Sequence, residues 1–181
     1  MWYTFVIHSI GRIKIMFNKI YIIGPVGSGK TTFAKSLSNK YSINYYELDK
    51  VVFDDDNGNI KRTDEEIAQI FNNIIKKNKW IIEDVGRKNF IEGIKKADIV
   101  YYLDLNKYQI YKRCLSRWFR QRIGKENYNY KPTLNGLFEM LGWARKNTKE
   151  KDKKIKRIID NCREYKILNL EDINMLENLK D

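Results

Sequence analysis

A glycine-rich segment with a lysine and two threonines is the part of this sequence that most clearly indicates a binding or catalytic site. The segment GPVGSGKTT covers residues 24–32 and has the spacing of a phosphate-binding P-loop. Glycines allow backbone N–H groups to approach phosphate oxygens, Lys30 would neutralise the β- and γ-phosphates, and the Thr31 hydroxyl would ligate Mg²⁺. The sequence therefore predicts a site for a nucleoside triphosphate, formed by Gly24, Pro25, Val26, Gly27, Ser28, Gly29, Lys30, Thr31 and Thr32.

Four acidic residues stand where apolar runs end. Asp49 follows one such run, Glu83 and Asp84 follow a second, and Asp104 follows a third. In open parallel sheets, ligands bind beyond the carboxyl ends of the strands. One carboxylate there could help to hold Mg²⁺, and another could accept the proton of a substrate hydroxyl. For each residue alone, a helix cap or a salt-bridge partner is an equally good interpretation.

The positive charge of the chain is concentrated in one segment. The formal net charge is +12, and residues 107–163 contain 17 Lys and Arg against 5 Asp and Glu. Arg113 and Arg117 are four residues apart, which places them on one face of a predicted helix that also carries Arg120 and Arg122. This charge should attract phosphates, on a nucleotide or on a nucleic-acid backbone. For residues 149–157 we favour an amphipathic surface helix.

Alternating patterns predict the elements that must position these residues. Short apolar runs predict five strands, at 19–23, 44–48, 80–82, 99–103 and 166–170. Helical periodicity predicts helices at 30–40, 63–77, 90–96, 107–122, 133–163 (as one or two helices) and 172–179. The Thr63-x-x-Glu66 capping box marks the start of the second helix, and loops are expected at 54–59 and 123–132. The alternation predicts one α/β domain over residues 1–181, with a parallel sheet covered on both faces.

Other features exclude several classes of protein. Cys114 and Cys162 are the only cysteines, which gives no disulfide framework and no metal pattern and fits a reducing cytoplasm. The apolar runs are all shorter than the roughly 20 residues that span a bilayer, so we expect no membrane partner. We interpret Met16 as the natural start and residues 1–15 as an N-terminal extension. The alternative is an additional N-terminal strand.

Several of these segments together resemble a known family. The sequence is similar to the adenylate-kinase-like P-loop kinases, and within them to the DNA topology modulation (FlaR-type) proteins, from about Lys19 to the last strand. The resemblance implies a P-loop NTPase fold with five parallel strands in the order 2-3-1-4-5, ATP and Mg²⁺ as cofactors, and a short helical lid within residues 107–148. It is carried by GPVGSGKTT, YELDKVVF, KWIIEDVGR, ADIVYYLDL and RCLSRWFRQR.

The resemblance also implies roles for individual residues. Glu83 would take the acidic position near the metal, Arg87 would grip the acceptor, and Asp49 would lie near the acceptor hydroxyl. Arg113 and Arg117 match the lid arginines in spacing. The run from Glu83 to Arg87 lacks the Gly and Pro of the nucleoside monophosphate kinase pattern, which argues against AMP as acceptor, and residues 123–132 contain no Cys or His for a zinc lid.

Three functional interpretations follow. The first is a cytoplasmic kinase, monomeric or homodimeric, that transfers the γ-phosphoryl group of ATP to a small molecule, with a nucleotide or nucleoside as the favoured acceptor. Here Lys30, Asp49 and Arg117 would be catalytic. The second is a nucleotide-dependent protein associated with nucleic acid, and the third is a nucleotide sensor without an acceptor. In the second, bases could stack on Trp118, Phe119, Tyr128, Tyr130 and Trp143.

Overall fold

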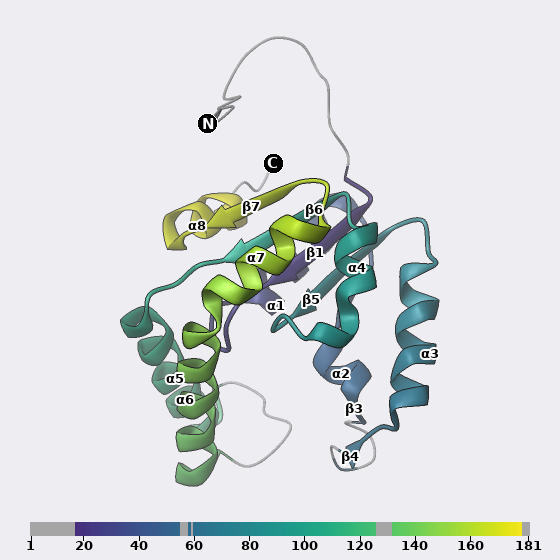
Figure 1. The fold of residues 1–181 in the computed structure, drawn as a ribbon. Coiled ribbons are helices and arrows are strands. Elements are labelled where there is room, and N and C mark those ends of the chain that lie inside the picture. The colour runs from purple at the N-terminus through teal and green to yellow at the C-terminus, as the bar shows by residue number, and fades with distance from the viewer. Residues whose placement is uncertain (1–16, 55–57, 59, 126–131, 179–181) are drawn as a thin grey trace.

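A parallel five-stranded sheet forms the centre of the protein. The computed structural model describes residues 17–54, 58, 60–125 and 132–178. Its strands lie in the order β2-β5-β1-β6-β7 (Figure 1), which in chain order is the predicted 2-3-1-4-5. The fold class is therefore confirmed. The strands are β1 (Lys19–Ile23), β2 (Tyr45–Glu47), β5 (Trp80–Asp84), β6 (Ile99–Leu103) and β7 (Tyr165–Leu168).

Helices cover both faces of this sheet. One face packs against α2 (Leu48–Val52), α3 (Asp64–Ile75), α4 (Ile91–Lys96) and α7 (Lys151–Asn161). The other packs against α1 (Lys30–Tyr41), α5 (Lys107–Arg122), α6 (Leu134–Lys149) and α8 (Leu170–Asn178). The 3-10 helix η1 (Lys88–Phe90) leads into α4.

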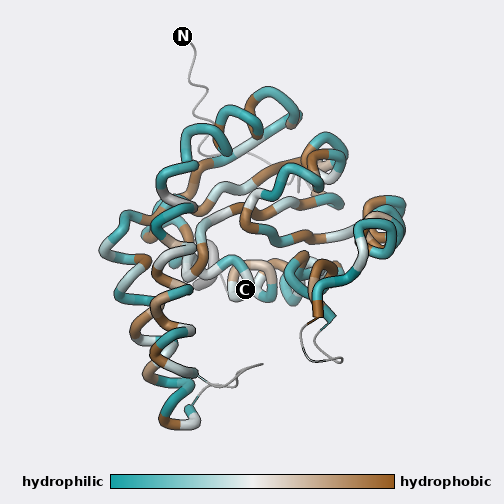
Figure 2. The backbone as a smooth tube through the Cα atoms, turned by 60° about the horizontal axis from the view of Figure 1, so that its bottom comes forward, coloured by the Kyte–Doolittle hydropathy of each residue, from teal (hydrophilic) through white to brown (hydrophobic). Residues whose placement is uncertain are grey.

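The central strand β1 shows why the chain forms three layers. Tyr21 and Ile23 point into the core beneath α4 and α7, while Ile20 and Ile22 point into the core beneath α1 and α8. A strand that is buried on both faces reads as a largely apolar run, and brown stretches recur along the sheet in Figure 2. Because all five strands run parallel, their carboxyl ends meet at one edge of the sheet.

The strand predicted at 44–48 is shorter at both ends, because β2 spans Tyr45–Glu47. The strand ends at Glu47 rather than at residue 48, because Leu48–Val52 forms the short helix α2. Arg62 makes this helix possible by donating to the carbonyls of Lys50 and Phe53, at 2.7 and 2.8 Å, which satisfies acceptors that a helix end leaves free. The predicted loop at 54–59 is flanked by a two-stranded hairpin, β3 (Phe53–Asp54) with β4 (Ile60–Lys61).

The C-terminal part also differs in its boundaries. Residues 133–163 form two helices, α6 and α7, which meet at Glu150. The last strand is Tyr165–Leu168, and the last helix begins at residue 170 instead of 172. The cause is a reciprocal cap, in which the Asn169 and Asp172 side chains each accept a hydrogen bond from the other's backbone N–H.

Two capping boxes fix the helices nearest to the charged residues. The predicted Thr63–Glu66 box is confirmed at the start of α3. A second box, Asn106 with Gln109, begins α5 and was not recognised in the sequence. The predicted bounds of α5 are confirmed. The expectations for residues 1–15, for Tyr128 and Tyr130, and for most of the loop at 123–132 lie outside the described residues.

Gly93 in α4 is a position where packing excludes any side chain. A Cβ atom there would lie 2.6 Å from Cε2 of Tyr21 and 3.0 Å from Cζ of Phe71. We expect Gly93→Ala to lower the free energy of unfolding by about 2 kcal/mol through overpacking, measured by urea denaturation. Gly142→Ala is the matched control, because a Cβ on Gly142 meets nothing within 4 Å. Equal stability of Gly93→Ala and wild type would contradict this packing.

Candidate active site

The P-loop lies between β1 and α1, and its backbone is set up for an anion. Gly27 and Gly29 have φ angles of 78° and 94°, in the left-handed region that favours glycine. Gly29 is also the N-cap of α1, and it has no side chain to accept from the first N–H groups of the helix. These N–H groups and the positive end of the helix dipole therefore remain available to phosphate oxygens.

Helix α5 packs directly onto this loop. A Cβ on Gly27 would lie 2.8 Å from Sγ of Cys114, and a Cβ on Gly29 would lie 2.8 Å from Nη1 of Arg113. The Arg113 guanidinium donates to the Ser28 carbonyl at 2.9 Å. The glycines are thus required by both conformation and space, and Arg113 already lies against the phosphate loop.

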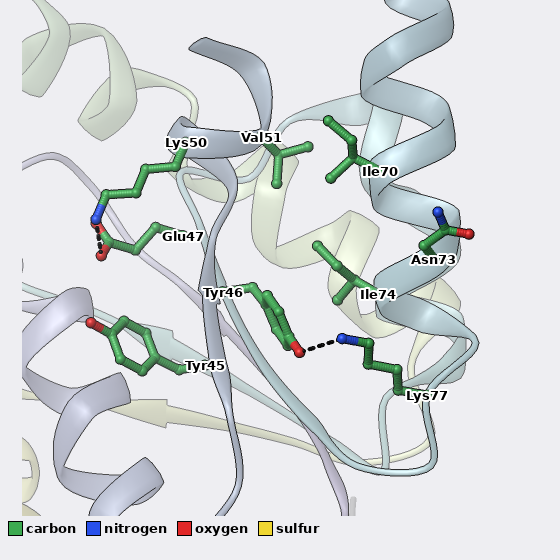
Figure 3. Close-up of a pocket in the computed structure, with 9 residues that line it drawn as sticks. All are labelled: Tyr45, Tyr46, Glu47, Lys50, Val51, Ile70, Asn73, Ile74 and Lys77. Atoms are coloured by element: carbon green, nitrogen blue, oxygen red, sulfur yellow. Dashed lines mark hydrogen bonds and ion pairs between the residues drawn. The ribbon is translucent and has the colours of Figure 1, made fainter. Parts of the chain in front are cut away.

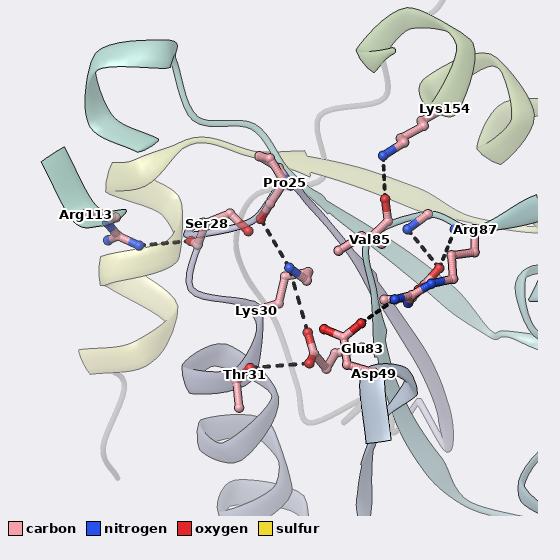
Figure 4. A network of polar contacts seen from close by, with 12 residues as sticks. Pro25, Ser28, Lys30, Thr31, Asp49, Glu83, Val85, Arg87, Arg113 and Lys154 are labelled. Atoms are coloured by element: carbon pink, nitrogen blue, oxygen red, sulfur yellow. Dashed lines mark hydrogen bonds and ion pairs between the residues drawn. The ribbon is translucent and has the colours of Figure 1, made fainter. Parts of the chain in front are cut away.

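Lys30, Thr31 and Glu83 meet beneath the loop (Figure 4). The Lys30 ammonium donates to the Pro25 carbonyl at 3.1 Å and lies 3.9 Å from Oε2 of Glu83. The Thr31 hydroxyl donates to Oε1 of Glu83 at 3.3 Å. Oε2 of Glu83 is buried and accepts no hydrogen bond from the part of the chain that the structure describes. A buried carboxylate oxygen that can still accept a hydrogen bond or bind a cation therefore faces the P-loop.

Burial dominates the electrostatics of Glu83. Desolvation raises the pKa of this carboxyl group; Lys30 lowers it, while Asp49, Glu47 and Asp84 raise it further. A divalent cation would favour the ionised form. Within the described residues, no group of three or more His, Cys, Asp or Glu could hold a metal alone. The oxygens of Thr31 and Glu83 fit Mg²⁺ in the way that is usual beside nucleotide phosphates, with few protein ligands.

The loop after β5 presents Arg87. Oδ2 of Asp84 accepts from the backbone N–H groups of Gly86 and Arg87, at 2.8 and 2.6 Å. Oδ1 of Asp84 accepts from Nη1 of Arg87 at 2.6 Å, and Nη2 of Arg87 pairs with Asp49. Asp84 therefore shapes the loop and orients the arginine, while Asp49 reaches the same guanidinium from α2.

Helix α7 holds the same loop from above. Lys154 donates to the Val85 carbonyl at 2.5 Å, and Arg157 donates to the Gly86 carbonyl at 3.1 Å. Lys154 is buried, and desolvation lowers its pKa. Sequence reasoning missed both residues by treating 149–157 as a surface helix. The available signal was that Lys154 lies four residues before Ile158, on the apolar face of α7.

The structure separates the predicted site residues into groups. Lys30, Thr31, Glu83, Asp49, Arg87 and Arg113 gather at the carboxyl edge of the sheet. Arg117 lies one turn beyond Arg113, where it is exposed. Asp104 instead pairs with Lys151 at 2.6 Å, as the salt-bridge interpretation expected.

Two open pockets lie outside the P-loop. The first, of about 550 Å³, follows the edge strand β2 towards α3, and in it Lys77 donates to the Tyr46 hydroxyl at 2.8 Å (Figure 3). The second, of about 450 Å³, lies between the starts of α5 and α8 and includes Asp104 and Lys151. Residues 24–32 line neither of these two pockets. The phosphate site is thus recognised by its hydrogen-bond donors and charged side chains, and not by either of these pockets.

The raised pKa of Glu83 predicts how stability depends on pH. Below the pKa of a carboxyl group in the unfolded chain, Glu83 is neutral in both states. As pH rises, the unfolded chain loses this proton first, so the buried group increasingly disfavours folding until pH passes its folded pKa. We therefore expect nucleotide-free Glu83→Gln to gain stability relative to wild type as pH rises, so that the gap in melting temperature, variant minus wild type, grows from acid to neutral pH.

Thermal melts of both proteins between about pH 4 and pH 8, without Mg²⁺, measure this gap. Glu164→Gln, at an exposed carboxyl group, is the matched control. A gap that is the same at every pH, or one that shrinks as pH rises, would show that burial does not raise the pKa of Glu83.

Comparison with known proteins agrees with this architecture. The shikimate kinase from Acinetobacter baumannii in complex with shikimate aligns with a TM-score of 0.55 and 16% identity, covering 87% of each chain. The shikimate kinase from Bacteroides thetaiotaomicron aligns with a TM-score of 0.57 and 15% identity, covering 92% of this chain and 90% of that one. An uncharacterized protein from Eubacterium ventriosum aligns with a TM-score of 0.50 and 18% identity, covering 90% and 95%.

The sequence itself identifies the family. No curated protein matches the chain. The family described as "AAA domain" matches residues 20–130, which is more than half of the chain and includes the P-loop, Glu83, Arg87 and the whole of α5. The chain therefore belongs to the AAA domain family, and its fold is the α/β fold of the P-loop kinases.

Proposed function

We propose that this protein is a kinase that transfers the γ-phosphoryl group of ATP to a small-molecule acceptor. The observation that carries the proposal is the group of Lys30, Thr31 and the buried Glu83 directly beneath the P-loop. Phosphoryl transfer depends mainly on positioning and charge neutralisation, which this group is suited to provide. The resemblance to the FlaR-type proteins remains a prediction.

The nucleotide phosphates would lie on the P-loop. Backbone N–H groups of residues 27–31 would bind the phosphate oxygens, and Lys30 would contact the β- and γ-phosphates. Arg113 already lies against Ser28, and Arg117 on the next turn would add a second guanidinium from the lid. Thr31 and Glu83 would hold Mg²⁺, which when bound neutralises charge between the phosphates.

The acceptor would lie between Asp49 and Arg87. Its hydroxyl oxygen would form the new bond to the γ-phosphorus, the bond to ADP would break, and the hydroxyl proton would pass to Asp49. Asp84 holds Arg87 in place, whereas the Asp49 side chain is 59% exposed and can be displaced from the guanidinium. An acceptor phosphate that took over Arg87 would free Asp49 for the hydroxyl.

Because an acceptor phosphate could replace Asp49 at Arg87, we propose a nucleotide as the acceptor. A nucleoside is the second candidate. The hydroxyl compound shikimate belongs in the same screen, because two of the similar structures are shikimate kinases and one of them contains shikimate. Water would compete with any acceptor for the phosphoryl group. Closure of α5 and α6 over the phosphates would exclude that water.

Lys30→Ala tests the phosphate site. We expect acceptor-stimulated ADP release from ATP and Mg²⁺ to fall by about 100-fold or more, because a charge that stabilises the transferring group is removed. The assay screens nucleoside monophosphates, nucleosides, shikimate and simple sugars with wild type first. Lys35→Ala, at an exposed lysine of the same helix, should keep full activity. Full activity in Lys30→Ala would refute the phosphate site.

Arg87→Ala tests the acceptor side. We expect the KM for the acceptor to rise by about tenfold or more, with ATP affinity nearly unchanged, because Arg87 lies away from the P-loop. Lys88→Ala, at the next exposed cation, is the matched control. Unchanged acceptor kinetics would show that Arg87 serves only to pair with Asp49 and Asp84.

A further inference from the structure

Helices α5 and α6 carry exposed apolar side chains that the nucleotide site does not use. On α5 and at its C-terminal end, these side chains recur with spacings of seven, four and four residues, which places them on one stripe. Two more, four residues apart, lie on the first turns of α6. They are between 47% and 75% exposed: Tyr108, Leu115, Phe119, Ile123, Leu134 and Phe138.

The stripe on α5 points away from the phosphate site. Arg113 marks the side that faces the P-loop, and at 100° per residue Leu115 and Phe119 are turned from it by about 160° and 120°. Ile110 and Cys114 mark the side buried against the body of the protein. Closure of α5 and α6 onto a nucleotide would therefore leave the stripe in solvent.

The two helices extend beyond the sheet, and apolar residues recur along both of them (Figures 1 and 2). They pack against each other, and Trp118 of α5 donates to the Thr133 carbonyl just before α6. The stripe residues line neither of the two pockets described above. The four residues of the α5 stripe thus face outward, and the two on α6 are exposed on the helix that packs beside α5.

The charge of this region indicates which kind of partner the surface can bind. Residues 107–149 contain 11 Lys and Arg but only 2 Asp and Glu. Lys112 is an exposed cation within the α5 stripe, one turn after Tyr108, and Lys125 is an exposed cation just beyond the end of the stripe. A second copy of the chain would bring like charges together, so the charge disfavours self-association and favours an anionic partner.

The side chains distinguish between anionic partners. Half of the six are aliphatic, and aliphatic groups gain little against a phosphate backbone or as stacking platforms for bases. An apolar stripe of Phe, Leu and Ile with flanking Lys and Arg is the composition of helices that lie in a membrane interface. Among the described residues, no helix is long and apolar enough to cross a bilayer, so contact would be at the surface.

We propose that the α5–α6 surface, defined as the six apolar residues above with Lys112 and Lys125, docks on an anionic phospholipid membrane. The apolar side chains enter the boundary between headgroups and acyl chains, and the two lysines contact anionic headgroups. This peripheral attachment departs from the sequence-based expectation of no membrane partner, which rested only on the absence of a run long enough to span a bilayer. It leaves the P-loop open to nucleotide because the two lie on different sides of α5.

Co-sedimentation with phospholipid vesicles tests the proposal. We expect the protein to bind vesicles of phosphatidylcholine with about 30% phosphatidylserine, and binding to weaken with added salt. Binding to pure phosphatidylcholine should be at least about tenfold weaker. The double variant Phe119→Ser, Phe138→Ser and the double variant Lys112→Glu, Lys125→Glu should each lose about tenfold or more.

Matched controls distinguish binding through the α5–α6 surface from non-specific binding by exposed apolar side chains. Ile60→Ser and Met175→Ser remove apolar side chains that are 65% and 69% exposed elsewhere, and both should bind like wild type. Failure of the anionic vesicles to bind the protein, or equal binding by the Phe119/Phe138 variant, would overturn the proposal. Two further outcomes would overturn it. In the first, the protein binds a single-stranded oligonucleotide, and in the second, it self-associates by light scattering. In each, the Phe119/Phe138 variant loses that property but still binds vesicles.

Discussion

The close approach of Lys30, Thr31 and Glu83 is the interaction on which the site depends. Two opposite charges are held in a buried place, and the ammonium lies 3.9 Å from the carboxylate. This separation leaves one carboxylate oxygen without a hydrogen bond from the described residues. Desolvation of such a pair is costly, and a bound cation with phosphates would offset that cost. The site is therefore less favourable when empty than when filled.

The rest of the fold keeps this arrangement in place. Parallel strands bring Glu83 and the P-loop to one edge, with Glu83 beside Ile22 of β1 and Glu47 of β2. Helix α5 packs on the P-loop through Cys114 and Arg113, and α7 holds the loop that carries Arg87. Since α6 leads directly into α7, the helix that packs against α5 and the helix that holds the Arg87 loop are neighbours in sequence.

Much of this architecture was accessible from the sequence, and the exceptions have physical causes. Buried strands and the Thr63 cap were predicted because apolar runs and capping boxes are local signals. The helix after β2 was missed because a distant side chain, Arg62, satisfies its carbonyls. Asp84 and Asp104 could not be told from Glu83 in the sequence. Their roles depend on partners far along the chain or around a turn, such as Lys151 for Asp104.

The same limit applies to the basic segment. The sequence showed where the positive charge lies, but not that Lys154 turns inwards to the Val85 carbonyl while Lys112 stays in solvent. Helical spacing over residues 107–122 predicted a basic helix, on which apolar residues also recur. That spacing does not reveal whether the apolar side is covered by the protein, and on α5 one apolar stripe is buried while another is exposed.

The most direct test of the central claim is a calorimetric titration of ATP into the protein, with Mg²⁺ and then with excess EDTA. A site built from Lys30, Thr31 and Glu83 predicts one ATP per chain and clearly tighter binding with Mg²⁺ than with EDTA. It also predicts that Glu83→Gln removes most of the difference. Absence of ATP binding, or binding that neither Mg²⁺ nor Glu83→Gln alters, would contradict the account.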